Sequence, residues 1–156
     1  MDHESFMKRA IELSRMNMQA GAGGPFGAVV VKDGKIVGEG WNQVTSSNDP
    51  TAHAEVVAIR NACRTLDTFK LSGCTIYTSC EPCPMCLAAI YWARLDRIVY
   101  ANTHTDAAAI GFDDAFLYRE LNLPLERRQV PASRLLADEA HRVFEEWAAK
   151  PDKIPY

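Results

Sequence analysis

Two short stretches of the sequence carry side chains suited to hold a metal ion. His53 lies in TAHAEVVAIR (51–60), and Cys83 and Cys86 stand three residues apart in CEPCPMC (80–86). Residues three apart on a helix share one face, so both sulfurs can reach one ion. A helix N-terminus favours the thiolate, which is the form that binds zinc. The pattern predicts a zinc site formed by His53, Cys83 and Cys86, with the fourth tetrahedral position open to water.

Glu55 follows His53 by two residues. On a helix this spacing turns its side chain away from the ligand direction, so we expect it to contact the water and not the metal. Bound zinc lowers the pKa of a water molecule to about 7. A carboxylate beside that water can take its proton and deliver it elsewhere, which predicts Glu55 as the catalytic proton shuttle.

Other arrangements of the cysteines remain open. Cys83 and Cys86 could form a redox pair, although such a pair needs no upstream histidine or glutamate. A closed structural zinc site would add Cys80 as a fourth ligand, although Pro82 and Pro84 interrupt the backbone between Cys80 and the helix. Two further cysteines, Cys63 and Cys74, are interpreted as small buried apolar residues, and His104 follows a predicted strand that could bring it near the site.

The elements that would position these residues alternate between strands and helices. Apolar periodicity predicts helices over 2–20, 52–65, 83–93 and 135–149, and a short helix beginning near Asp113. Strands are predicted over 27–31, 35–42, 74–79, 97–101 and 127–131. Asp2 and Thr51 are predicted helix caps, and Asp33-Gly34 predicts a type I′ hairpin turn. The order indicates an α/β fold with a mixed sheet covered on both faces.

The bulk composition suits one domain with one core. The chain has 156 residues, 47% of them hydrophobic, and a net charge of −3, which argues mildly against a nucleic acid as the main partner. Its apolar runs are too short to cross a bilayer, and its N-terminus has no signal-peptide pattern, so we expect no membrane partner and a cytoplasmic location. The odd number of cysteines, five, argues against a disulfide framework.

The HAE run followed by PCPMC resembles the zinc-deaminase signature H-x-E…P-C-x-x-C, so the sequence is similar to the cytidine deaminase superfamily. Within it, GGPFGAV, NDPTAHAE, SCEPCPMCLAAIYWAR, GFDDAF and the terminal tyrosine most resemble the bacterial guanine deaminase branch. The resemblance implies a three-layer α/β/α fold with a five-stranded sheet and a single deaminase domain over 1–156. It also implies a homodimer in which residues from about 130 to 156 are exchanged between subunits.

The resemblance also implies roles and a reaction. His53, Cys83 and Cys86 match the ligands of one zinc per subunit, and Glu55 matches the proton shuttle. The residues that match purine-binding positions are Phe26, Asn42, Trp92, Asp114 and Tyr156. The implied reaction is hydrolysis of the purine base guanine to xanthine and ammonia.

Several alternatives to these implied roles remain open. Guanosine, cytosine or adenosine in tRNA could replace guanine as substrate, and a non-catalytic zinc module is the alternative from a different class. Phe26 could be plain core, Trp92 core or a dimer contact, Asn42 a turn residue and Asp114 a helix cap.

Overall fold

The first helix begins where the sequence predicts it. In a computed structural model, which describes residues 2–156, α1 spans His3–Gln19. The backbone N–H of Ser5 donates to Asp2 Oδ1 at 2.9 Å, which confirms Asp2 as the N-cap. Phe6, Ala10 and Leu13 form the buried face of this helix.

The predicted hairpin is present as β1 (Gly27–Lys32) and β2 (Lys35–Trp41), which pair antiparallel. Lys32 pairs with Lys35, and the two residues between them, Asp33 and Gly34, have φ values of 48° and 72°. Two positive φ values in a two-residue loop define the type I′ turn, so that prediction is confirmed.

Within residues 2–156 the sheet has four strands in the order β2-β1-β3-β4, not the five implied by the resemblance. β3 (Cys74–Cys80) runs antiparallel to β1, and β4 (Arg97–Asn102) runs parallel to β3. The strand predicted over 127–131 is wrong, because Leu125–Arg127 forms the short 3-10 helix η1 and residues 128–136 form no strand. Pro131 has no N–H to give to a ladder, and Val130 is 79% exposed, so this run has little to gain from sheet pairing.

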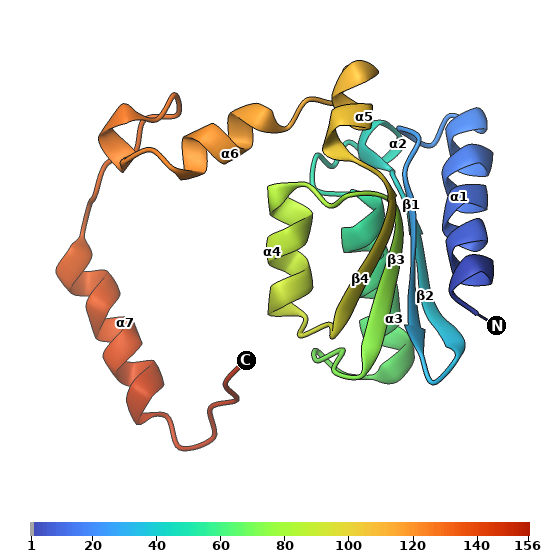
Figure 1. The fold of residues 1–156 in the computed structure, drawn as a ribbon. Coiled ribbons are helices and arrows are strands. Elements are labelled where there is room, and N and C mark those ends of the chain that lie inside the picture. The colour runs from blue at the N-terminus through green and yellow to red at the C-terminus, as the bar shows by residue number, and fades with distance from the viewer. Residues whose placement is uncertain (1) are drawn as a thin grey trace. The chain divides into compact units, whose positions relative to one another are not determined.

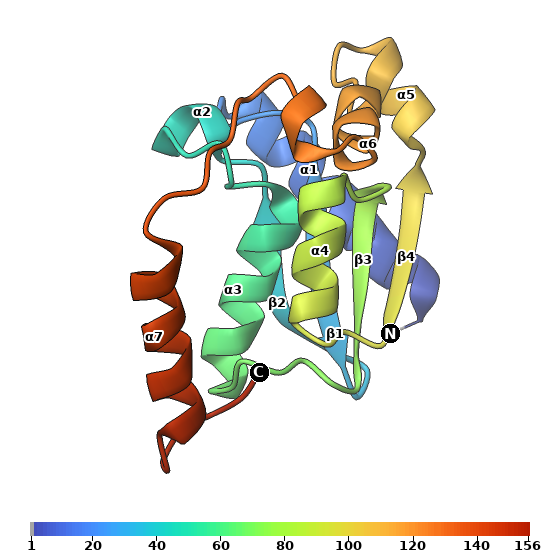
Figure 2. The same cartoon turned by 90° about the vertical axis from the view of Figure 1, so that its left-hand side faces the viewer.

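Helices cover both faces of the sheet and make three layers (Figures 1 and 2). α3 (Ala54–Leu66) and α4 (Pro84–Trp92) lie side by side on one face, and α1 covers the other. One core cluster includes Ala58, Ile76 and Ile90, and the second includes Phe6 and Tyr77. Two short helices, α2 (Val44–Ser47) and α5 (His104–Ala109), were not predicted.

The start of α3 differs from the sequence prediction. His53, and not Thr51, occupies the N-cap position, with an extended backbone (φ −70°, ψ 154°). The Thr51 hydroxyl instead donates to Asp49 Oδ1 at 2.6 Å, so the threonine completes a local turn before the helix.

Gly40 allows α3 to approach β2 closely. A Cβ atom at this position would overlap the Ala54 carbonyl oxygen and the Ala58 backbone nitrogen. The absence of a side chain at Gly40 therefore sets the depth at which the first turns of α3 sit on the sheet.

The chain divides into two units, the first ending at Asp114 and the second covering residues 115–156. The second unit contains α6 (Ala115–Leu121), η1 and α7 (Ala137–Ala149), close to the helices predicted near Asp113 and over 135–149. Within 115–156 no residue is buried. Across the described residues, no helix has both the length and the apolar character to span a membrane.

Candidate active site

Three predicted ligands converge between the N-termini of α3 and α4. His53 and Cys83 are the N-caps of these helices, and Cys86 lies in the first turn of α4 with no exposed surface. His53 Nδ1 is 3.6 Å from Cys83 Sγ and 3.4 Å from Cys86 Sγ, and the three donor atoms all lie within 4.8 Å of one another. The structure therefore brings the histidine and both cysteines together.

These separations fit a tetrahedral zinc ion. Zinc binds nitrogen at about 2.0–2.1 Å and sulfur at about 2.3 Å, so tetrahedral angles place a nitrogen and a sulfur ligand about 3.6 Å apart. The two observed nitrogen–sulfur distances lie at or near that value. The donor set of one imidazole and two thiols is also one that zinc prefers.

The electrostatics of the group favour one thiolate even before a metal binds. Contacts with the Cys86 thiol and with His53 lower the pKa of Cys83 to about 4, against the opposing effect of burial. The same shared contact, together with burial, raises the pKa of Cys86. The contact with Cys83 raises the pKa of His53 as well, so imidazolium and thiolate stabilise each other.

Cys80 does not join this group among the residues that the structure describes. It is buried, and its Sγ contacts the Thr103 carbonyl oxygen at 3.7 Å. Burial raises the pKa of Cys80 to about 11, so it is a neutral thiol at pH 7. This arrangement favours the three-ligand site over a closed four-ligand site.

Glu55 lies in the first turn of α3 and is 5% exposed. The Thr78 hydroxyl lies 2.7 Å from Glu55 Oε1. Burial is the main cause that raises the pKa of Glu55, and contacts with Cys86 and Thr78 oppose it. A carboxyl group with a raised pKa beside a metal-ligand cluster is suited to accept and release protons near neutral pH.

Asn42 follows β2 and is almost fully buried, at 7% exposure. Its Oδ1 accepts hydrogen bonds from the backbone N–H groups of Gly24, at 3.2 Å, and Val44, at 3.1 Å. These two bonds fix which end of the amide carries the oxygen, so the NH2 group faces the other way as a donor. A role for Asn42 in binding a base stays a prediction.

The other predicted substrate residues lie in different surroundings. Phe26 packs edge-to-face on Phe112 with the ring centroids 5.0 Å apart. Asp114 is half-buried; desolvation raises its pKa, and the nearby His104 opposes the shift. His104 Nδ1 lies 2.9 Å from Glu81 Oε1. Tyr156 belongs to residues 115–156 and is exposed there, so its role also stays a prediction.

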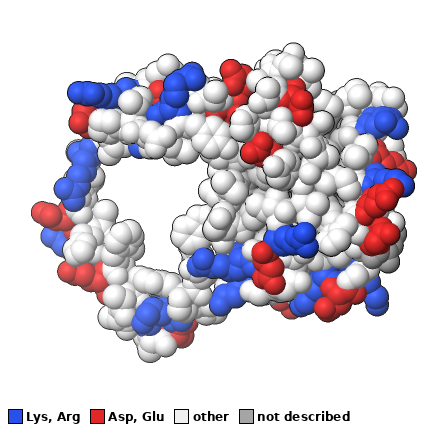
Figure 3. All heavy atoms as spheres, in the orientation of Figure 1, with Lys and Arg blue, Asp and Glu red and all other residues white. Residues whose placement is uncertain are grey.

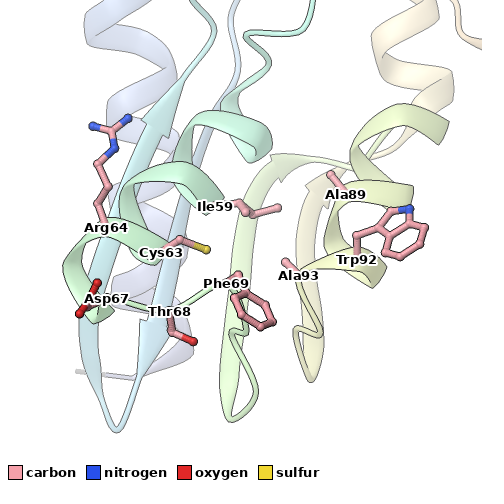
Figure 4. A pocket seen from close by; sticks show the side chains of 9 residues that line it. All are labelled: Ile59, Cys63, Arg64, Asp67, Thr68, Phe69, Ala89, Trp92 and Ala93. Atoms are coloured by element: carbon pink, nitrogen blue, oxygen red, sulfur yellow. The ribbon is translucent and has the colours of Figure 1, made fainter. Parts of the chain in front are cut away.

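Trp92 is not brought to the ligand group within one chain. It stands at the C-terminal end of α4, whereas Cys86 is in the first turn. There Trp92 lines a groove of about 650 Å³ between α3 and α4, together with Ile59, Cys63, Phe69 and Ala93 (Figure 4). This groove differs in position and lining from the metal-ligand cluster.

Thr78 is the site residue that sequence reasoning missed. A signal for it exists in β3, where Cys74, Ile76 and Thr78 share one face, and the first two belong to the apolar core. A polar residue at the third position of a buried apolar face needs a hydrogen-bonding partner, which here is Glu55.

Comparisons with known proteins agree with this chemistry. The family model of the cytidine and deoxycytidylate deaminase zinc-binding region matches residues 1–102. A guanine deaminase of Bacillus subtilis (strain 168) is 54% identical over 156 residues, which is 100% of both chains. The X-ray structure of guanine deaminase from Bacillus subtilis has a TM-score of 0.97 and covers 100% of this chain and 99% of that one.

Two further matches name different ligands. A crystal structure in complex with 2,6-diaminopurine is 34% identical, with a TM-score of 0.68, and covers 98% of this chain and 84% of that chain. A tRNA-specific adenosine deaminase of Haemophilus influenzae is 40% identical over 117 residues, which is 71% of this chain and 67% of that protein.

Proposed function

Because the chain belongs to the cytidine and deoxycytidylate deaminase zinc-binding family, we propose that it hydrolyses guanine to xanthine and ammonia. The observation that carries this proposal is the 54% identity to a Bacillus subtilis guanine deaminase over the full length of both chains. The convergence of the histidine, the two cysteines and a buried glutamate supplies residues that such a hydrolysis needs.

His53, Cys83 and Cys86 would hold one zinc ion in each subunit. When bound, zinc activates a water molecule as a nucleophile at neutral pH. The chain itself contributes the charge balance of this site, because the lowered pKa of Cys83 keeps that ligand ionised. Burial of Cys86 and Glu55 excludes bulk water from the same place.

Glu55 would act as the proton shuttle of the reaction. Its carboxylate takes a proton from the attacking water and delivers it to a ring nitrogen of guanine. It then takes the second proton from the hydroxyl group now on the amino-bearing carbon and gives it to the amine, which leaves as ammonia. The raised pKa of Glu55, caused mainly by burial, brings the carboxyl group closer to neutral pH, where one group can serve as both base and acid.

Asn42 and Asp114 would hold the base so that its amino-bearing carbon faces the zinc site. The Asn42 amide donor is fixed by the Gly24 and Val44 N–H groups, which makes it a preorganised partner for an acceptor on the purine. Asp114, a half-buried residue whose pKa is raised by desolvation, would accept hydrogen bonds from N–H groups on the purine edge. Phe26 would pack on the ring, and Trp92 and Tyr156 would complete the pocket from the second subunit of a dimer.

We further propose that residues 1–156 act as one deaminase domain in a homodimer, with the segment from about 130 to 156 exchanged. Residues 115–156 bury no side chain, and α7 exposes Val143, Phe144 and Trp147. Apolar side chains at such spacing on a helix need a covering surface. Size-exclusion chromatography with light scattering checks the dimer, and a monomer at micromolar concentration would contradict it.

A tRNA substrate is the second candidate, because one relative is named a tRNA-specific adenosine deaminase. Binding to a phosphate backbone requires clustered Lys and Arg. Basic and acidic side chains are interspersed on the face shown in Figure 3, and the chain has a net charge of −3. These charges favour a free base over tRNA as the substrate. They do not separate guanine from guanosine, because the two differ only by an uncharged ribose.

The test is ammonia release by the zinc-loaded protein from guanine, guanosine, adenine, cytosine and an adenosine-containing tRNA anticodon stem. Release from guanine with xanthine as the product supports the proposal. Turnover of guanosine or tRNA in preference to guanine would keep the zinc chemistry and overturn the proposed substrate.

A further inference from the structure

Thr78 places a hydroxyl group on a buried and otherwise apolar face of the sheet. It lies in β3, in register with Ala28 of β1 and Tyr100 of β4, and its side chain is fully buried. Its face of the strand continues from Cys74 and Ile76, both of which belong to the apolar core. Valine has nearly the same shape as threonine and would suit these surroundings without any hydrogen bond.

The Thr78 hydroxyl oxygen lies between two acceptors. It is 2.7 Å from Glu55 Oε1 and 2.9 Å from the Cys80 carbonyl oxygen. A hydroxyl group has one hydrogen, so it can donate to only one of them at a time. When Glu55 is ionised the hydroxyl donates to the carboxylate. When Glu55 holds a proton, the hydroxyl accepts a hydrogen bond from the carboxyl group and donates its own hydrogen to the Cys80 carbonyl oxygen.

We propose that Thr78 is the positioning residue for the Glu55 proton shuttle, holding Oε1 throughout the reaction and leaving Oε2 as the oxygen that exchanges protons. The inference rests on the proposed deaminase function. Thr78 acts on turnover through Glu55, because its hydroxyl bonds to Glu55 and to the Cys80 carbonyl oxygen, and neither group is one of the three predicted ligands. Removal of the hydroxyl should therefore change kcat and leave zinc content unchanged.

The experiment compares Thr78→Val with Thr78→Ser in the zinc-loaded enzyme. We expect Thr78→Val to lower kcat on guanine by about 10- to 100-fold, the usual size of a lost hydrogen bond to a charged group. KM should stay within about threefold, because ground-state binding of the base is unchanged. Thr78→Ser keeps the hydroxyl and should retain kcat within about threefold. Zinc content is measured for every variant.

Thr75→Val is the matched control, because Thr75 lies in the same strand on the opposite face and lines a different surface near Asp2 and Gly34. It should leave kcat unchanged. Thr78→Val is also made in a Glu55→Gln background, where it should have no further effect if the two residues act as one unit. An additive loss in the double variant would indicate a general structural defect and overturn the proposal.

Two results separate this inference from the proposed function. If the wild-type enzyme produces no xanthine, the proposed function fails. If the wild type is active, and if Thr78→Val is folded, zinc-loaded and equal to it in kcat, only the inference about Thr78 is overturned. If Thr78→Val does not fold, Thr78→Ala is compared with Thr78→Ser, and equal kcat values for those two would refute the inference.

Discussion

Replacement of Gly40 by alanine tests whether the close approach of α3 to β2 positions the metal site. The added Cβ would overlap backbone atoms of Ala54 and Ala58, which cannot rotate away as a side chain could. The helix must therefore shift outward. His53 is the N-cap of that helix, so the shift also separates its Nδ1 from the sulfurs of Cys83 and Cys86.

The expected cost follows from two opposing terms. Overpacking a tight contact costs about 1–3 kcal/mol, and the backbone obstruction at Gly40 places this case near the upper end. Replacing glycine by alanine recovers about 0.4–1 kcal/mol by restricting the unfolded chain. The net loss is about 2 kcal/mol, which for a chain of this size lowers the unfolding midpoint by roughly 4–8 °C.

The assay is thermal unfolding by circular dichroism, combined with zinc affinity from competition with a chelator. We expect zinc to bind about tenfold or more weakly in Gly40→Ala, as is usual when support around metal ligands is disturbed. Lys35→Ala, at an exposed position of the same strand, is the control and should change stability by less than about 0.5 kcal/mol. An unchanged midpoint and zinc affinity in Gly40→Ala would refute the reasoning.

Three further predictions concern individual side chains of the site. Cys80→Ala should keep one zinc per chain by mass spectrometry, because Cys80 lies outside the ligand group, and loss of zinc would indicate a closed four-ligand site. In the metal-free protein at pH 6, Cys83, with a pKa of about 4, is a thiolate, whereas Cys80, with a pKa of about 11, is protonated. An alkylating reagent should therefore modify Cys83 before Cys80, as checked by peptide mapping, and bound zinc should protect Cys83. Asn42→Asp keeps the acceptor for two backbone N–H groups but loses the amide donor, so it should fold normally and raise KM for guanine by about tenfold; an unchanged KM would exclude Asn42 from base binding.

The convergence of His53, Cys83 and Cys86 was predictable because each residue had a local signal. The C-x-x-C spacing and the H-x-E run both stand at helix starts, and short-range geometry determines which face their side chains share. The Asp2 cap and the Asp33-Gly34 turn were predictable for the same reason, because three or four residues contain all the interactions that define them.

Other features depend on contacts that the local sequence does not reveal. Thr51 has the side chain of a cap, yet Asp49 competes for its hydroxyl group, and the helix starts two residues later. The run at 127–131 has some strand character, but a strand needs a partner edge and backbone donors, and Pro131 removes one. The partner of Thr78 is 23 residues away in the chain, so only the packing of α3 on the sheet makes that contact visible.

The central claim is that the protein deaminates guanine at a His–Cys–Cys zinc site, with the buried Glu55 as the proton shuttle. The most direct test is to measure zinc content and xanthine formation in parallel for the wild type and for Glu55→Gln. The account predicts one zinc per chain in both proteins, guanine turnover by the wild type, and a loss of kcat of at least about 100-fold in Glu55→Gln. Zinc-loaded wild type that leaves guanine unchanged, or Glu55→Gln with wild-type turnover, would contradict it.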